Sequence, residues 1–167
     1  MEIKLDINEF AMDGTANTVI FDLDGTLADI EERRTLATKD NGKIDWDIFF
    51  DPKNIDLDKP NHSVILMAKI LKQSGHRIVI FSGRSKATKD ETRKWLKAHG
   101  VPFDVLKMRP TSGGFKFMKD DKLKKLWLDD LFPTKEDIVC VFDDRDAVVQ
   151  MWRDNGLDCF QVAEGKF

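Results

Sequence analysis

Residues 18–29 read Thr18-Val-Ile-Phe-Asp-Leu-Asp-Gly-Thr-Leu-Ala-Asp29, and this stretch organises the rest of the chain. Its apolar run, Val19 to Phe21, predicts the end of a buried strand. The strand delivers Asp22 and Asp24 two residues apart and then breaks at Gly25. Two carboxylates this close raise one another's pKa unless a positive charge neutralises them. The pattern therefore predicts a hard divalent cation such as Mg²⁺ at the carboxyl end of a strand, with at least one more acid arriving from elsewhere.

The alternative for this acidic pair is a simple turn after an ordinary strand. A lone Asp-x-Asp would favour that alternative. The apolar run before the pair and Gly25-Thr26 after it favour catalysis instead.

The run Asp22-Leu-Asp-Gly-Thr26 resembles the first motif of the haloacid dehalogenase (HAD) phosphohydrolase superfamily. The resemblance implies that Asp22 is the nucleophile that attacks phosphorus. It also implies that Asp24 is the general acid/base that protonates the leaving oxygen.

Length and composition indicate one globular domain. The chain has 167 residues, of which 41% are hydrophobic and 34% charged, and these are ordinary values. A net charge of −3 gives no global field that attracts a polyanion, so a nucleic-acid substrate would need a local Arg/Lys cluster. Cys140 and Cys159 lie in apolar runs and are expected to be buried thiols. Neither a signal peptide nor a membrane-length apolar run is present, so we expect a cytoplasmic protein without a membrane partner.

Segments with strand and helix patterns alternate along the chain. Further strands are predicted at 77–81, 101–106, 137–142 and 159–162, and helices at 28–38, 61–73, 88–99, 117–131 and 147–155. This alternation predicts an α/β fold with a central parallel sheet and right-handed crossovers, in keeping with a HAD-like (Rossmann-like) three-layer sandwich. Residues 18–167 form this domain, and residues 1–17 are expected to form an N-terminal arm or extra strand.

The residues from about 30 to 60 are expected to form a small helical cap or lid over the site. They carry three aromatic residues, Trp46, Phe49 and Phe50. We expect these side chains to pack the cap down, and stacking on nucleobases is the alternative use.

Polar residues follow three of the other predicted strands. Ser82-Gly83-Arg84 follows strand 77–81, where a hydroxyl beside a glycine suits a phosphoryl oxygen and resembles the second motif of the superfamily. Arg109 lies past strand 101–106, on the ligand side. Asp143 and Asp144 follow strand 137–142 and are the expected additional acids, with an exposed acidic turn as the alternative.

An ordered set of motifs resembles a narrower group, the 3′-phosphatase domain of phage polynucleotide kinase–phosphatase enzymes. The resemblance spans about Val19 to Phe167, and beside the first motif it rests on Ser82-Gly83-Arg84, Thr92-Arg93-Lys94-Trp95, Gly100-Val101-Pro102, Lys119-Asp120-Asp121 and Asp143-Asp144-Arg145. The chain departs from this group in two places. Residues 111–117 contain Gly and Phe where the group tends to be charged, and residues 46–50 have no clear counterpart.

The resemblance implies an Mg²⁺-dependent polynucleotide 3′-phosphatase and assigns its site residues. The catalytic residues are Asp22, Asp24, Ser82 and Lys124. The substrate-binding residues are Arg33, Gly83, Arg84, Arg109 and Arg145. The metal ligands are Asp22, Asp24, Asp143 and Asp144. Spacing alone does not select Lys124 from the four lysines between 119 and 125.

Two other functions stay open at this point, a small-molecule (nucleotide) phosphatase and a non-catalytic module that binds phosphorylated ends. The expected substrates are DNA or RNA 3′-phosphate ends or nucleotides, and a homo-oligomer or a separate kinase or ligase partner also stays open. The chain contains no Gly-x-x-x-x-Gly-Lys-[Ser/Thr], so we do not expect a P-loop kinase activity from it. If the chain is encoded by a phage, its location would be the host cytoplasm.

Overall fold

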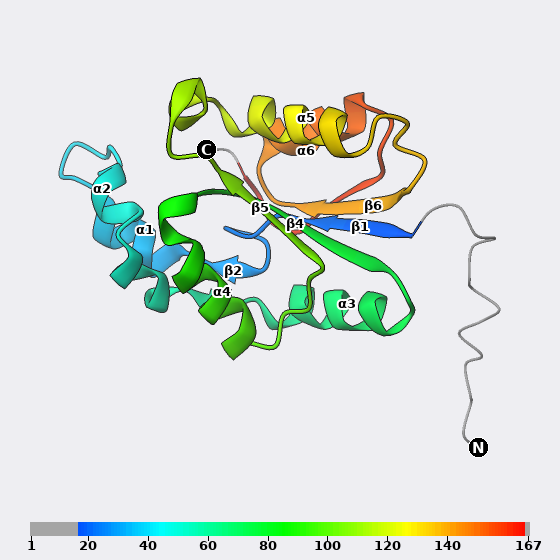
Figure 1. Ribbon diagram of the computed structural model, residues 1–167. Coiled ribbons are helices and arrows are strands. Elements are labelled where there is room, and N and C mark those ends of the chain that lie inside the picture. Colours follow the sequence, from blue (N-terminus) through cyan, green and yellow to red (C-terminus); the bar gives the residue numbers. More distant parts are fainter. Residues whose placement is uncertain (1–16, 166–167) are drawn as a thin grey trace, which may run out of the picture.

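A computed structural model describes residues 17–165, with a five-stranded sheet at the centre (Figure 1). Every pairing in this sheet is parallel. In spatial order the strands are β5 (Val105–Arg109), β4 (Arg77–Ser85), β1 (Thr18–Phe21), β6 (Ile138–Asp143) and β7 (Cys159–Gln161). The predicted α/β fold is confirmed, and β1 lies at its middle.

Helices cover both faces of the sheet, which gives three layers (Figure 1). Helices α3 (His62–Gln73) and α4 (Lys89–Ala98) lie on one face, and α5 (Asp120–Leu131) and α6 (Asp146–Asp154) lie on the other. Each helix turns an apolar stripe inward, as α4 does with Thr92, Trp95 and Leu96 at helical spacing.

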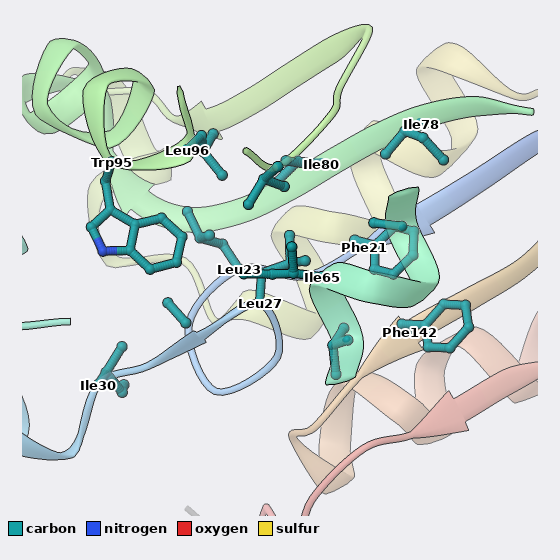
Figure 2. Packing of buried hydrophobic residues seen from close by; sticks show 14 of the residues in the cluster. Phe21, Leu23, Leu27, Ile30, Ile65, Ile78, Ile80, Trp95, Leu96 and Phe142 are labelled. Atoms are coloured by element: carbon teal, nitrogen blue, oxygen red, sulfur yellow. The ribbon is translucent and has the colours of Figure 1, made fainter. Parts of the chain in front are cut away.

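The two faces of the sheet have separate apolar cores, because successive residues of a strand point to opposite sides. Val19 and Phe21 belong to the core under α3 and α4, which Figure 2 shows together with Ile65, Trp95 and Phe142. Ile20 belongs to the other core, which contains Phe81, Trp127 and Trp152. Because β1 is buried on both faces, the residues that follow it are held firmly in place.

A small insertion separates β1 from α3. Strands β2 (Ala28–Asp29) and β3 (Lys59–Pro60) pair antiparallel at its base. Between them lie α1 (Glu31–Ala37), α2 (Trp46–Phe49) and the 3₁₀ helix η2 (Pro52–Leu57). Figure 1 shows α1 and α2 at the end of the sheet where β1 stops. Phe49 and Ile55 are buried in the first core and anchor the insertion.

The structure differs from the sequence prediction at several element boundaries. The helix predicted at 28–38 begins at Glu31, because residues 28 and 29 form β2. The strand predicted at 101–106 lies instead at 105–109, so Arg109 ends the strand rather than following it. The helix predicted to begin at 117 begins at 120, because Gly113–Phe117 form the 3₁₀ helix η4. Trp46 was expected to pack inward but is 58% exposed and stacks on Phe50 at 5.7 Å.

Other features agree with the prediction or lie outside the described residues. Cys140 and Cys159 are buried free thiols, as expected. The predicted N-terminal arm, residues 1–17, lies outside the described residues except for Asn17. None of the helices within residues 17–165 has the length and apolar character needed to cross a bilayer.

Candidate active site

Three carboxylates meet at the carboxyl ends of β1 and β6. Asp22 follows β1, Asp143 ends β6, and the register Phe21↔Phe142 brings the two strand ends level. One carboxylate oxygen from each of Asp22, Asp143 and Asp144 lies within 4.8 Å of the others, and all three residues are buried. The acids predicted from two distant parts of the sequence therefore form one cluster.

Lys124 lies between two of these carboxylates. It projects from the second turn of α5, and its Nζ donates to Asp22 Oδ1 at 2.6 Å and to Asp143 Oδ2 at 2.8 Å. The other three lysines of the predicted set differ from it, because Lys119 and Lys122 are exposed and Lys125 pairs with Asp129. The structure thus distinguishes Lys124, which spacing alone could not.

Further donors fix the orientation of the acidic cluster. Asp143 Oδ1 accepts the backbone N–H groups of residues 144 and 145, and Trp152 Nε1 donates to its Oδ2 at 3.1 Å. The Thr26 hydroxyl donates to Asp144 Oδ1 at 3.3 Å. Neither Trp152 nor Thr26 was a predicted site residue, because a tryptophan on an apolar helix stripe reads as core.

The electrostatics of the cluster show a shortage of positive charge. Burial raises the pKa of Asp22 well above its usual range, the carboxylates of Asp143 and Asp144 add to the rise, and Lys124 offsets only part of it. Burial and Asp143 likewise raise the pKa of Asp144. Burial alone would lower the pKa of Lys124, but Asp143 and Asp22 outweigh it and keep the ammonium charged. Three buried carboxylates with one lysine fit a hard divalent cation bound by oxygen ligands.

The Asp24 carboxylate is not among the three whose oxygens lie within 4.8 Å of one another, and its role as a fourth metal ligand stays a prediction. Its Oδ1 accepts from Arg33 Nη2 at 2.8 Å and from Arg84 Nε at 2.7 Å, which turns the carboxylate toward the guanidinium groups. Burial alone would raise the pKa of Asp24, but Arg84 and Arg33 outweigh it and lower the pKa. Among residues 17–165, no hydrogen bond or ion pair engages its second oxygen, Oδ2.

Arg33 and Arg84 were predicted to bind substrate, and the structure places both beneath Asp24. Each guanidinium is fully buried and also contacts Asp58, with Arg33 Nε at 2.8 Å and Arg84 Nη2 at 2.5 Å. The Phe49 ring lies 4.3 Å from the Arg33 guanidinium, and the Phe49 carbonyl accepts from it. Asp24, Arg33, Arg84 and Asp58 therefore form one buried network, to which Arg33 links the insertion.

Asp58 is a functional candidate that the sequence prediction missed. It is one of several acids in residues 51–58, and nothing in the sequence separates it from its exposed neighbour Asp56. Burial raises the pKa of Asp58 to about 6, with Arg84 opposing the rise and Asp24 adding to it. Trp95 Nε1 donates to its backbone carbonyl at 2.9 Å, which fixes the end of the insertion against α4.

The other predicted substrate residues, Gly83, Arg109 and Arg145, lie around Asp120, and the predicted catalytic residue Ser82 directly precedes Gly83. The buried Ser82 hydroxyl accepts from the Arg84 backbone N–H at 3.2 Å. An added Cβ at Gly83 would lie 2.8 Å from Asp120 Oδ1, so only glycine leaves room for that carboxylate. Asp120 pairs with both Arg109 and Arg145, the latter at 2.7 Å. The Arg145 side chain is 33% exposed and is thus the more accessible guanidinium of the two.

Gly25 allows the acidic cluster to form, so we expect Gly25→Ala to weaken divalent-cation binding about 10- to 100-fold. Its φ of +88° is unfavourable for alanine, and a Cβ there would lie 2.2 Å from Asp144 Oδ2. Titration calorimetry with Mg²⁺ would measure the change. Gly42→Ala is the matched control, because Gly42 has a φ of +77° but no atom within 4 Å of the added Cβ. Equal affinities in both variants would contradict this role for Gly25.

Comparison with known proteins finds a matching family and a similar viral protein. The family described as the polynucleotide kinase PNKP phosphatase domain matches residues 16–167. A protein of Autographa californica nuclear polyhedrosis virus, named as a bifunctional polynucleotide kinase/RNA ligase, is 32% identical over 141 residues, covering 81% of this chain and 18% of the relative. The chain therefore spans about a fifth of that relative's length.

Solved structures with a similar fold include two that represent different degrees of sequence identity. A chain in the structure of the Pnkp1/Rnl/Hen1 RNA repair complex is 31% identical with a TM-score of 0.73, covering 91% of this chain and 44% of that one. CbbY from Rhodobacter sphaeroides, solved in complex with phosphate, is 17% identical with a TM-score of 0.62. The match covers 91% of this chain and 87% of CbbY, and at this identity it shows a shared fold alone.

Proposed function

Since the chain belongs to the polynucleotide kinase PNKP phosphatase domain family, we propose that this phosphatase removes the terminal phosphate from 3′ ends of DNA or RNA, with Mg²⁺ at its acidic cluster. One observation carries the proposal. Asp22 lies at a strand end between the Lys124 ammonium and two further carboxylates, which is where a nucleophile for phosphorus needs charge neutralisation.

In the first step, an oxygen of Asp22 forms a bond to phosphorus and the bond from phosphorus to the 3′ oxygen breaks. Lys124 holds Asp22 in place and offsets negative charge on the transferring group. Ser82, at the end of the neighbouring strand β4, is proposed to bind a phosphoryl oxygen. A bound divalent cation, held by Asp22, Asp143 and Asp144, would supply the remaining positive charge and keep Asp22 ionised.

Asp24 is proposed to move the protons. It protonates the leaving 3′ oxygen in the first step and then accepts a proton from the water that attacks the aspartyl-phosphate, which releases inorganic phosphate and restores Asp22. Arg33 and Arg84 both donate to Oδ1 of Asp24, so Oδ2 is the oxygen proposed to transfer the protons. Because these arginines lower the pKa of Asp24, the approach of a phosphate dianion is what favours its protonated form.

The cap and the relatives extend the proposal. Arg33 belongs to the cap helix α1 and contacts Asp24, so cap placement and the orientation of the acid/base are coupled. A lid over the substrate end is therefore part of the proposed function. The named relatives are a kinase/ligase and an RNA repair complex, so we also propose that a kinase or ligase works alongside this domain.

A substrate panel tests the proposal directly. Phosphate release would be measured on 3′- and 5′-phosphorylated oligonucleotides, 3′- and 5′-mononucleotides and sugar phosphates, with Mg²⁺ or with a chelator. The expected result is metal-dependent release that is fastest from 3′-phosphorylated oligonucleotides. Activity confined to mononucleotides or sugar phosphates would overturn the nucleic-acid assignment and leave a small-molecule phosphatase.

We expect cation binding to weaken as the pH falls. The raised pKa values of Asp22 and Asp144 mean that these groups hold protons at pH values where an ordinary carboxyl group, with a pKa near 3.8, is ionised. A cation must displace these protons, so its apparent affinity rises with pH through the raised pKa values. Calorimetry in buffers of different ionisation enthalpy would measure the protons released.

The stability of the metal-free protein should depend on the same two carboxyl groups, but it should fall as the pH rises, whereas the cation affinity rises. At Asp22 and Asp144 the folded state binds more protons than the unfolded state, so the contribution of these two groups to the free energy of unfolding falls as the pH rises through their raised pKa values. Added Mg²⁺ should therefore raise the Tm more at high pH than at low pH. A pH-independent Tm gain would contradict this coupling.

A further inference from the structure

Phe117, in the loop between β5 and α5, is exposed far beyond what packing explains. It is 87% exposed, the highest value among the large hydrophobic side chains of residues 17–165. A phenylalanine in this position loses most of the stabilisation that burial would give. Its exposure therefore points to a use other than folding.

Arg109 forms hydrogen bonds to the backbone on both sides of Phe117. Arg109 Nη1 donates to the carbonyls of Phe115 at 2.7 Å and Met118 at 2.6 Å, on either side of Phe117. Arg109 Nε donates to the Gly83 carbonyl at 3.0 Å, next to the predicted phosphate-site serine. The exposed ring is thus carried on a loop that is fixed to the active site.

The loop also lies close to that site. Helix α5 begins three residues after Phe117, at Asp120, which pairs with Arg109 and Arg145. Three residues of chain reach at most about 10 Å. Figure 1 shows the loop before α5 at the same end of the sheet as α1 and α2. The loop that carries Phe117 therefore lies at the end of the sheet where β1 stops and Asp22 follows.

The charge around the ring suits nucleic acid rather than an apolar partner. Lys116 Nζ lies 5.5 Å from the centroid of the Phe117 ring, and Lys119 is exposed two residues further on. Single-stranded nucleic acid is bound by this combination, with bases stacked on aromatic rings and phosphates near cations. The whole chain carries a net charge of −3, so such local cations matter.

We propose that Phe117 is a stacking platform for the base of the terminal nucleotide, which orients its 3′ phosphate toward Asp22. The inference rests on the proposed function and deepens it. It makes the enzyme selective for ends that carry a base, without reading the base sequence, because every base offers a stacking surface.

The test compares two single-stranded oligonucleotides that differ only at the end, one with a normal 3′-phosphorylated nucleotide and one with an abasic 3′-phosphorylated residue. In the unmodified protein, kcat/KM should be about 5- to 150-fold higher for the end that has a base. In Phe117→Leu, this ratio should fall to about one- to twofold. Phe160→Leu is the matched control and should keep the ratio, since Phe160 is 57% exposed on β7, at the opposite edge of the sheet.

A binding measurement separates failure of this inference from failure of the proposed function. Asp22→Asn protein would be titrated with an oligonucleotide that carries 2-aminopurine at its 3′-phosphorylated end. Quenching that Phe117→Leu removes would support stacking even if turnover on 3′ ends were absent. The inference would be overturned if Phe117→Leu left either the kcat/KM ratio or the quenching of 2-aminopurine fluorescence unchanged. It would also be overturned if Phe117→Leu kept the ratio but changed a dimer to a monomer in light scattering, because Phe117 would then form a contact between proteins.

Discussion

Replacing Asp22 with asparagine is expected to lower turnover by roughly 10⁴-fold or more, with the protein still folded. The amide oxygen can still accept from Lys124, so the side chain keeps its volume and this contact, but it cannot attack phosphorus. Phosphate release from a 3′-phosphorylated oligonucleotide would measure the loss. Acid-quenched reactions should also show no phosphate bound to the variant protein.

Stability separates a lost nucleophile from a lost fold. Asparagine carries no charge, so it avoids the cost of burial and the like-charge repulsion that together raise the pKa of Asp22. The free energy of unfolding without metal should therefore stay within about 1 kcal/mol of the unmodified value. Asp137→Asn is the matched control, an exposed acid at the opposite end of β6. Near-normal turnover in Asp22→Asn would overturn the nucleophile assignment.

Much of this site could be predicted from the sequence, because it depends on strand ends. Val19–Phe21 is apolar enough to place β1 at the centre of a parallel sheet, and the residues after such strands share one edge. The meeting of Asp22 with Asp143 and Asp144 follows from this rule. The chemistry at the end of a buried strand can therefore be inferred from the local sequence.

Contacts between distant loops were not predictable in the same way. The local sequence around Arg33 and around Arg84 predicts arginines near a phosphate. Neither stretch shows that Asp58 is buried against both guanidinium groups. Leu126 shows the same limit on a helix, because it lies in one apolar pattern with Leu123 and Trp127 but is 46% exposed while they are buried. The helix pattern that begins at 117 starts too early, because Phe117 ends η4 and residues 118 and 119 are extended. Burial of a polar residue depends on partners that the local pattern does not contain.

Asp58→Ala is expected to have the largest effect on stability, a loss of about 3–5 kcal/mol, because it leaves the buried charges of Arg33 and Arg84 with one carboxylate instead of two. For a domain of this size, the loss corresponds to a fall in Tm of about 10 °C or more. Thermal and urea unfolding would measure it. Asp56→Ala is the matched control, because Asp56 is exposed in the 3₁₀ helix η2, which ends just before Asp58.

The activity of Asp58 variants shows whether this network also positions the acid/base. Asp58→Asn keeps the shape and one acceptor oxygen, so it should stay folded at a temperature where turnover can be measured. If Arg33 and Arg84 hold Asp24 in place only when Asp58 holds them, kcat should fall about 100-fold while KM changes little, since a shift of about 1 Å at a catalytic group has this effect. The fall should be smaller for substrates with an acidic leaving group, such as a nitrophenyl phosphate, because these need little protonation. An equal fall in kcat for both kinds of substrate would show that Asp58 contributes to folding alone. Arg33 and Arg84 would then orient Asp24 without help from Asp58.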